Sequence, residues 1–148
     1  MDIEKIKAFI EEAERLKTVT RTAYTSEGIT ETTAEHSWRL ALLASVVADE
    51  YPGLNEERVL IMCLIHDIGE IYDGDIPAVK QTDKEQKYEI ELKAARKIFS
   101  LLPEKIGERM MEIWREYNDC KTPEARLVKA LDKAETIIQH NQGKNPDD

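Results

Sequence analysis

The stretch that says most about the fold is VLIMCLIHD, residues 59–67. Its first seven residues are apolar nearly all round a helix, which is the pattern of a helix covered by neighbours on every side. Asn55, followed by two glutamates, supplies a helix start just before it, because a side-chain cap and early carboxylates complement the first-turn N–H groups. We therefore expect the central helix of the fold to end in His66 and Asp67.

Outward from this stretch, apolar residues recur at spacings of three and four along most of the chain, which indicates an all-α fold of about six helices. Capping boxes and a Thr-Pro-Glu start mark several of the helix beginnings. The helices are expected at about Ile3–Lys17, Thr32–Tyr51, Asn55–Asp67, Thr82–Leu102, Pro103–Tyr117 and Thr122–His140. The stretch 18–33 has no clear period and is expected to be a loop, as is the stretch 73–77.

Length and composition fit one compact helical domain over residues 1–148, with a helical core at about 3–141 and a short frayed C-terminal tail. The chain has 148 residues, of which 41% are hydrophobic and 34% charged, so disordered and membrane-spanning classes are disfavoured. No signal peptide is apparent at the N-terminus. Cys63 and Cys120 form no C-x-x-C pair, which suits a reducing cytosol and gives no support for a thiolate metal site.

The charge balance limits the choice of partners. Thirty acidic residues against 21 Lys and Arg give a net charge of −9, which disfavours nucleic-acid polymers and anionic membranes. Small anionic substrates remain possible, because one arginine or one metal ion can set the local field.

Polar residues break the apolar pattern at three places. His66 and Asp67 end the most hydrophobic helix, where the helix dipole favours a cation rather than a carboxylate. His36 lies in the first turn of the second helix, and Asp132 lies among apolar residues of the last helix. Taken singly, these residues also have structural interpretations, as hydrogen-bonded core histidines or as a solvated aspartate.

Together, the two imidazoles and two carboxylates come from three helices, and helical bundles commonly build metal sites from facing helices. Mixed nitrogen and oxygen ligands suit a divalent cation such as Mn, Co, Fe or Ni, with Mg and Zn as further candidates. A closed structural zinc site is disfavoured because no thiolate takes part.

A set of ordered motifs extends this pattern over roughly residues 6–140. They are AEHSWR at 34–39, LIHDIGE at 64–70, GDIP at 74–77, IWREY at 113–117, TPEA at 122–125 and VKALDK at 128–133. With these motifs the chain resembles the HD-domain metal-dependent phosphohydrolases. Within that superfamily it is most similar to the 5′-deoxynucleotidases, which cleave phosphate from deoxyribonucleoside 5′-monophosphates.

The resemblance implies a role for each of seven residues. The metal ligands it implies are His36, His66, Asp67 and Asp132; the catalytic residues are Glu70 and Asp75; the phosphate-binding residue is Arg21. Lys80 is a further phosphate candidate by its position just after the GDIP turn, with a solvated surface lysine as the alternative. Arg21 is followed by Thr-Ala-Tyr where the family often has Thr-Gly-Trp, so an aromatic stacking surface is kept.

Three functions are compatible with these features. The leading one is a cytosolic, homodimeric, metal-dependent phosphomonoesterase acting on (deoxy)ribonucleoside 5′-monophosphates. The second is an HD-type phosphohydrolase of another phosphorylated metabolite or signalling nucleotide. The third is a non-catalytic helical binding module, which the presence of all four candidate ligands disfavours. Tyr117 is expected to lie in the core or in a subunit contact. Glu135 is expected at the surface or in helix pairing, with a place behind the metal ligands, one turn after Asp132, as the alternative.

Overall fold

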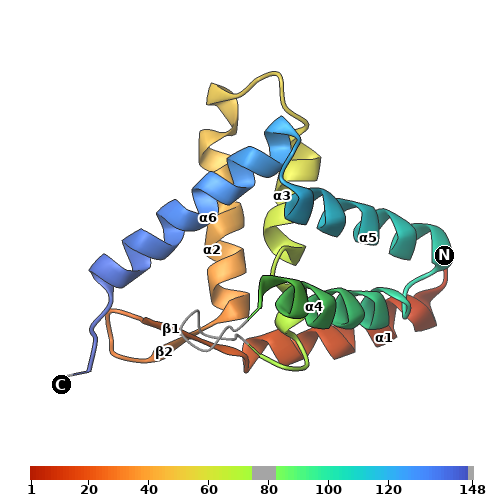
Figure 1. The fold of residues 1–148 in the computed structure, drawn as a ribbon, viewed down its shortest axis with the longest axis horizontal. Helices are drawn as coiled ribbons and strands as arrows, with labels where there is room; N and C mark the ends of the chain where they lie inside the picture. The colour runs from red at the N-terminus through yellow and green to blue at the C-terminus, as the bar shows by residue number, and fades with distance from the viewer. Residues whose placement is uncertain (75–82, 147–148) are drawn as a thin grey trace.

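The computed structural model describes residues 1–74 and 83–146, and this part of the chain contains six α-helices (Figure 1). The helices are α1 (Ile3–Ala13), α2 (Thr33–Val47), α3 (Glu56–Ile65), α4 (Lys84–Phe99), α5 (Glu104–Asp119) and α6 (Pro123–Gln142). Short 3₁₀ helices follow α1, α2 and α3, at Glu14–Lys17, Ala48–Glu50 and Ile68–Glu70 (η1, η2 and η3). The prediction of a predominantly helical fold is confirmed.

Local sequence signals account for where the helices begin. Thr32 caps α2 in a complete capping box with Glu35, Asn55 caps α3, and Thr122 caps α6 just before a proline in its first turn. Asp83 caps α4, so this helix starts close to the expected position. Each cap supplies an acceptor for a backbone N–H group that has no partner within the helix.

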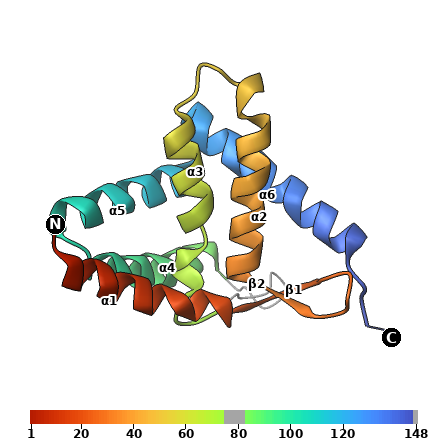
Figure 2. The ribbon, with the colours of Figure 1, turned by 180° about the vertical axis from the view of Figure 1, so that it is seen from behind.

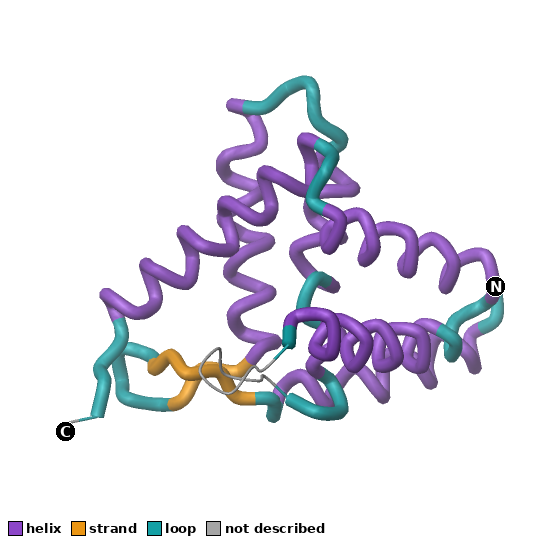
Figure 3. Tube along the Cα trace, in the orientation of Figure 1, coloured by secondary structure: helices purple, strands orange, loops and turns teal. Residues whose placement is uncertain are grey.

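The expectation of a loop at residues 18–33 is wrong in part, because a β-hairpin forms there (Figure 3). Strand β1 (Thr20–Tyr24) pairs antiparallel with β2 (Thr30–Thr32), and Gly28 adopts a positive φ of 84° in the turn between them. Threonine and tyrosine favour extended backbone. Strands this short carry too little periodicity to be recognised, and a two-stranded hairpin is stable only when it packs on other elements.

Helices α2 and α3 stand side by side, and α6 lies across α2, as both opposite views show (Figures 1 and 2). Helix α3 packs against α2, α5 and α6, so the predicted central helix is central. Its surface is not covered all round, since Leu64 is 50% exposed. Among the described residues, no helix is long and apolar enough to cross a membrane.

Helices α1 and α4 lie together across the lower end of α3 in both views (Figures 1 and 2). The short helix η3 packs so closely on α4 that a Cβ atom on Gly69 would lie 2.6 Å from Cβ of Glu91. Gly69, the second residue after the His-Asp pair, thus has no room for a side chain on that side. This contact sets the direction in which the chain leaves α3.

Candidate metal centre

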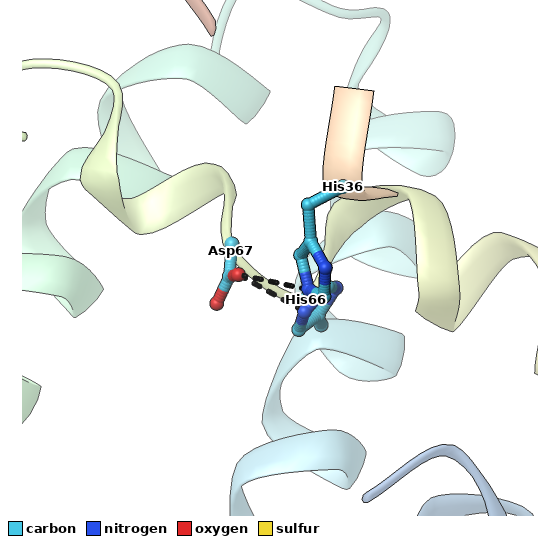
Figure 4. A group of neighbouring side chains, drawn as sticks. All are labelled: His36, His66 and Asp67. Carbon is cyan, nitrogen blue, oxygen red and sulfur yellow. Dashed lines mark ion pairs between the residues drawn. The ribbon is translucent and has the colours of Figure 1, made fainter. Parts of the chain in front are cut away.

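Three helices bring the candidate ligands to one point. His36 lies in the first turn of α2, His66 is the residue that ends α3, and Asp67 follows it directly. Asp132 lies near the middle of α6. Figure 4 shows the two imidazole rings and the Asp67 carboxylate facing one another. The positions where polar residues interrupt the apolar pattern therefore converge in space.

The distances within this cluster are short. His36 Nε2 lies 2.8 Å from Asp132 Oδ1, and His66 Nε2 lies 3.0 Å from Asp67 Oδ2. The cross distances are 3.8 Å from His36 Nε2 to Asp67 Oδ2 and 3.6 Å from His66 Nε2 to Asp132 Oδ1. Each imidazole Nε2 atom thus lies within 4 Å of both carboxylates. Both histidines are buried, whereas the Asp67 and Asp132 side chains are 22% and 23% exposed.

The other ring nitrogen of each histidine is already engaged. His66 Nδ1 lies 2.8 Å from the backbone carbonyl of Cys63, and His36 Nδ1 lies 2.5 Å from Glu135 Oε2. A carbonyl or carboxylate oxygen can only accept, so each Nδ1 atom carries a proton and donates it. In the neutral imidazoles, the lone pair is then on Nε2, the atom that faces the carboxylates.

The cluster stabilises positive charge. Burial alone would lower the pKa of His66, but the charge of Asp67 and the contact with Asp132 raise that pKa to about 10. Burial likewise opposes ionisation of Asp132, yet its contacts with His36 and His66 hold the pKa of Asp132 far below its usual value. The pKa of Asp67 is lowered for the same reason, chiefly by the charge of His66. A site that holds protons on imidazoles this strongly also attracts a cation.

These residues fit a divalent metal ion. His36, His66 and Asp67 each offer a ligand atom, and these three atoms lie within 4.8 Å of one another. The Nε2 atoms of both histidines are buried and lack an aligned hydrogen-bond partner within the described chain. Asp132 adds a second carboxylate beside them. Two nitrogen and two oxygen donors suit a first-row divalent ion. The absence of a thiolate disfavours a closed structural zinc site.

Strand β1 places Arg21 beside this cluster. Its Nη1 atom lies 3.4 Å from Asp67 Oδ2, and its Nη2 atom lies 3.4 Å from the Thr136 hydroxyl oxygen. Its Nε atom forms a 3.2 Å ion pair with Glu31, a buried residue of β2. The β1–β2 hairpin, which lies where a loop is expected from the sequence, is therefore the element that positions the predicted phosphate-binding arginine.

The remaining predicted residues have different outcomes. Glu70 is buried at the end of η3, where its Oε2 accepts a 3.0 Å hydrogen bond from the Thr33 hydroxyl at the start of α2. Asp75 and Lys80 lie outside the described residues. Tyr24 ends β1, and its carbonyl accepts a 2.8 Å hydrogen bond from Gln139 of α6.

Two residues expected to be structural contact the cluster directly. Glu135 is only 2% exposed, so it does not lie at the surface, and its contact with His36 joins α6 to α2 behind the proposed ligands. The Tyr117 hydroxyl donates a 3.2 Å hydrogen bond to Asp132 Oδ2, and its ring lies edge-on to His66 at 5.2 Å between centroids. A signal for Glu135 was present, because Val128, Asp132 and Glu135 share one face of the last helix.

Comparison with known proteins identifies the family of this chain. A family model for the HD domain matches residues 13–148. The 5′-deoxynucleotidase HDDC2 of Dictyostelium discoideum is 33% identical over 133 residues, covering 84% of this chain and 70% of the relative. The human 5′-deoxynucleotidase HDDC2 is 35% identical over 130 residues, covering 86% of this chain and 63% of the relative. The chain thus spans less than two thirds of the human relative's length.

A solved structure from Magnetospirillum magnetotacticum, described as a predicted metal-dependent phosphohydrolase, superposes with a TM-score of 0.83. It is 34% identical to this chain, and the match covers 93% of this chain and 69% of the other. Because the family match extends over most of the sequence and includes every helix that contributes to the cluster, this chain belongs to the HD domain family.

Proposed function

We propose that this chain is a metal-dependent phosphohydrolase that removes phosphate from nucleoside 5′-monophosphates, with a preference for deoxyribose. The observation that carries this proposal is the convergence of two imidazole Nε2 atoms on two carboxylates, with both Nδ1 atoms engaged elsewhere. The relatives named as 5′-deoxynucleotidases support the choice of substrate class. Release of free phosphate and a nucleoside is the expected outcome.

In this proposal His36, His66, Asp67 and Asp132 hold the divalent cation. When bound, the cation supplies a Lewis acid that polarises a phosphoryl oxygen, offsets developing negative charge and makes water more acidic. The protein's own part is mainly to position groups, because phosphoryl transfer depends on alignment and charge stabilisation more than on covalent chemistry.

Arg21 is the proposed phosphate-binding residue. Its Nε atom pairs with buried Glu31, which orients the guanidinium so that both Nη atoms lie on the cluster side. The contacts of its Nη atoms with Asp67 and Thr136 are each 3.4 Å long. A guanidinium at this position can form a bidentate, charge-assisted pair with a phosphate, which a lysine cannot.

Glu70 is proposed to orient the attacking water or accept a proton from it. It follows His66 by four residues, and its amide N–H donates a 3.0 Å hydrogen bond to the carbonyl of Asp67. The Thr33 hydroxyl fixes one of its carboxylate oxygens, so the side chain is held rather than free to rotate. Asp75 is proposed, from the family resemblance, to assist at the sugar or the leaving oxygen. Lys80 is proposed, from its position just after the GDIP turn, to assist at the phosphate.

We also propose that the chain acts as a cytosolic homodimer. Trp38, Leu42 and Val46 follow one another at four-residue spacing on α2 and are 61%, 50% and 71% exposed, which is consistent with an apolar face that a second copy covers. Sedimentation equilibrium of the purified chain tests the dimer. A single species with the mass of one 17.0 kDa chain at micromolar concentration would contradict it.

The activity is tested by phosphate release from a panel of ribo- and deoxyribonucleoside 5′-monophosphates. The protein is first stripped with a chelator and then supplied with Mn²⁺, Co²⁺, Mg²⁺ or Zn²⁺ singly. We expect release to depend on the metal and to be faster with deoxyribonucleotides. Absence of release with every metal, in protein shown to bind that metal, would contradict the proposed substrate class.

A further inference from the structure

Behind the proposed metal centre lies a buried acid whose position the metal ligands alone do not explain. We infer that Glu135 is a positioning residue, which holds His36 in the Nδ1–H form and so directs its Nε2 lone pair toward the cation. The inference rests on the metal site of the proposed function and does not depend on the identity of the substrate.

The geometry restrains Glu135 at both of its oxygens. Oε2 lies 2.5 Å from His36 Nδ1, and Oε1 accepts a 2.9 Å hydrogen bond from Nε of Arg39. Arg39 in turn donates from Nη1 to the side-chain oxygen of Gln142, at 2.8 Å. Both contacts of the carboxylate therefore come from α2, and Gln142 at the end of α6 holds Arg39 in place. Its rotation away from His36 would break both contacts.

The two histidines differ in how their Nδ1 atoms are engaged. His66 donates to a backbone carbonyl three residues earlier, a contact that belongs to its own helix. His36 donates to a side chain 99 residues later, so its orientation depends on one replaceable group. A carboxylate partner also makes an imidazole a stronger electron donor than a neutral carbonyl does. Glu135 is thus the point at which the metal affinity of His36 can be changed without removing a ligand.

The place of Glu135 is unfavourable for a purely structural residue. It is 2% exposed, and burial of a carboxylate is costly unless its charge is matched. Its negative charge also raises the pKa of Glu31, after the larger effect of burial on that residue, so the two acids repel each other. Val128, two turns earlier on the same face, shows that an apolar residue can fill the packing role.

The test is metal binding by chelator-stripped protein, measured by titration calorimetry with Mn²⁺ in the absence of substrate. For Glu135→Gln we expect the affinity for Mn²⁺ to fall about 10- to 100-fold, the size of effect typical for loss of such a partner. The matched control is Glu116→Gln. Glu116 pairs with Nε of Arg58, as Glu135 does with Arg39, and accepts a 2.7 Å hydrogen bond from Thr122.

A second variant separates positioning from packing. Arg39→Met keeps the Glu135 carboxylate but removes its anchor, so we expect a smaller loss of Mn²⁺ affinity than for Glu135→Gln. If Glu135 only ties α2 to α6, Glu135→Gln and Glu116→Gln will both lower the stability of stripped protein and leave the Mn²⁺ affinity within twofold of the parent. That result would overturn the inference.

Measuring phosphate release and Mn²⁺ binding separately distinguishes this inference from the proposed function. Failure of phosphate release with every nucleotide would contradict the substrate class and leave the binding measurement unaffected. Normal Mn²⁺ affinity in folded Glu135→Gln would contradict the role of Glu135 and leave the substrate class standing. Should Glu135→Gln not fold, unchanged Mn²⁺ affinity in Arg39→Met would count against the inference, and weakened affinity would support it.

Discussion

The junction of α2, α3 and α6 and the junction of α4 and α5 are both buried, but they are built from different residues. The first holds the buried histidines and glutamates, whereas the second is lined by side chains such as Ile98, Phe99, Ile113 and Trp114, all at most 1% exposed. In the described chain, α4 and α5 contribute no residue to the buried polar and charged set, and the polar atoms of their buried aromatic side chains are the hydroxyl of Tyr117 and the indole nitrogen of Trp114.

The difference shows where stability and chemistry reside. Burial of apolar side chains at the α4–α5 junction stabilises the folded state. Burial of like-charged carboxylates at the other junction opposes folding unless protons, arginines or a cation balance them. Substitutions in the first region should therefore change metal binding and catalysis, and those in the second should change stability. The predictions below test this separation, beginning with the largest effect.

Asp132→Asn keeps the size of the side chain and removes one proposed ligand charge. We expect Mn²⁺ binding to be lost and the rate of phosphate release to fall by on the order of 10³-fold, because a bound metal ion lowers the activation barrier by several kcal/mol. Phosphate release at saturating metal measures the effect, with Asp49→Asn, an exposed aspartate of η2, as the control. Activity near the parent level in Asp132→Asn would remove Asp132 from the site.

Phe99→Ala tests the other region. Phe99 is 1% exposed and stacks in a tilted arrangement with Phe9 at 6.1 Å between ring centroids. We expect the free energy of unfolding in urea to fall by about 3–5 kcal/mol, as for large-to-small changes in other cores. Mn²⁺ affinity of the folded variant should stay within twofold of the parent. A large loss of metal affinity without loss of stability would show that the two regions are not separate.

Arg21→Lys keeps a positive charge beside Glu31 and removes the two-pronged guanidinium. We expect kcat/KM to fall about 10- to 100-fold, since one charge-assisted hydrogen bond is worth roughly 1.5–3 kcal/mol. Mn²⁺ affinity should be unchanged, because Arg21 is not a proposed ligand. Arg126→Lys, at an exposed position of α6, is the matched control. Equal kinetics in parent and Arg21→Lys would argue against bidentate phosphate binding.

A change of one pH unit is expected to alter metal binding by the smallest of these amounts. The pKa of His66 without a cation is about 10, so below that pH a metal ion must displace the imidazole proton. The apparent affinity for Mn²⁺ should therefore rise with pH, by about tenfold per pH unit for one displaced proton. Calorimetry in buffers of different ionisation enthalpy measures the protons released. An affinity that does not change between pH 6.5 and 8.5 would rule out this competition.

Features of the fold could be predicted from the sequence where they depend on contacts between residues close together in the chain. Caps such as Asn55 and Thr122 act within three or four residues, so the helix starts were visible in the sequence. His66 and Asp67 stood out because they end an apolar run. The hairpin escaped prediction because contacts from distant residues hold it, including the hydrogen bond from Gln139 to the carbonyl of Tyr24.

The role of Glu135 stayed one of several alternatives for the same reason. Its partner His36 lies 99 residues earlier, and only the packing of α6 on α2 brings the two together. On a helix taken alone, a glutamate three residues after an aspartate is as consistent with a solvated face as with a buried contact. Local pattern therefore identified the ligand candidates, whereas the residues that orient them required the tertiary structure.

The central claim is that the α2–α3–α6 junction binds one divalent cation through His36, His66, Asp67 and Asp132. A crystal of the protein grown with Mn²⁺, with anomalous diffraction recorded near the manganese edge, tests it most directly. The account predicts one strong anomalous peak in contact with both imidazole Nε2 atoms and both aspartates. A strong peak elsewhere, with none between these four side chains, would contradict it.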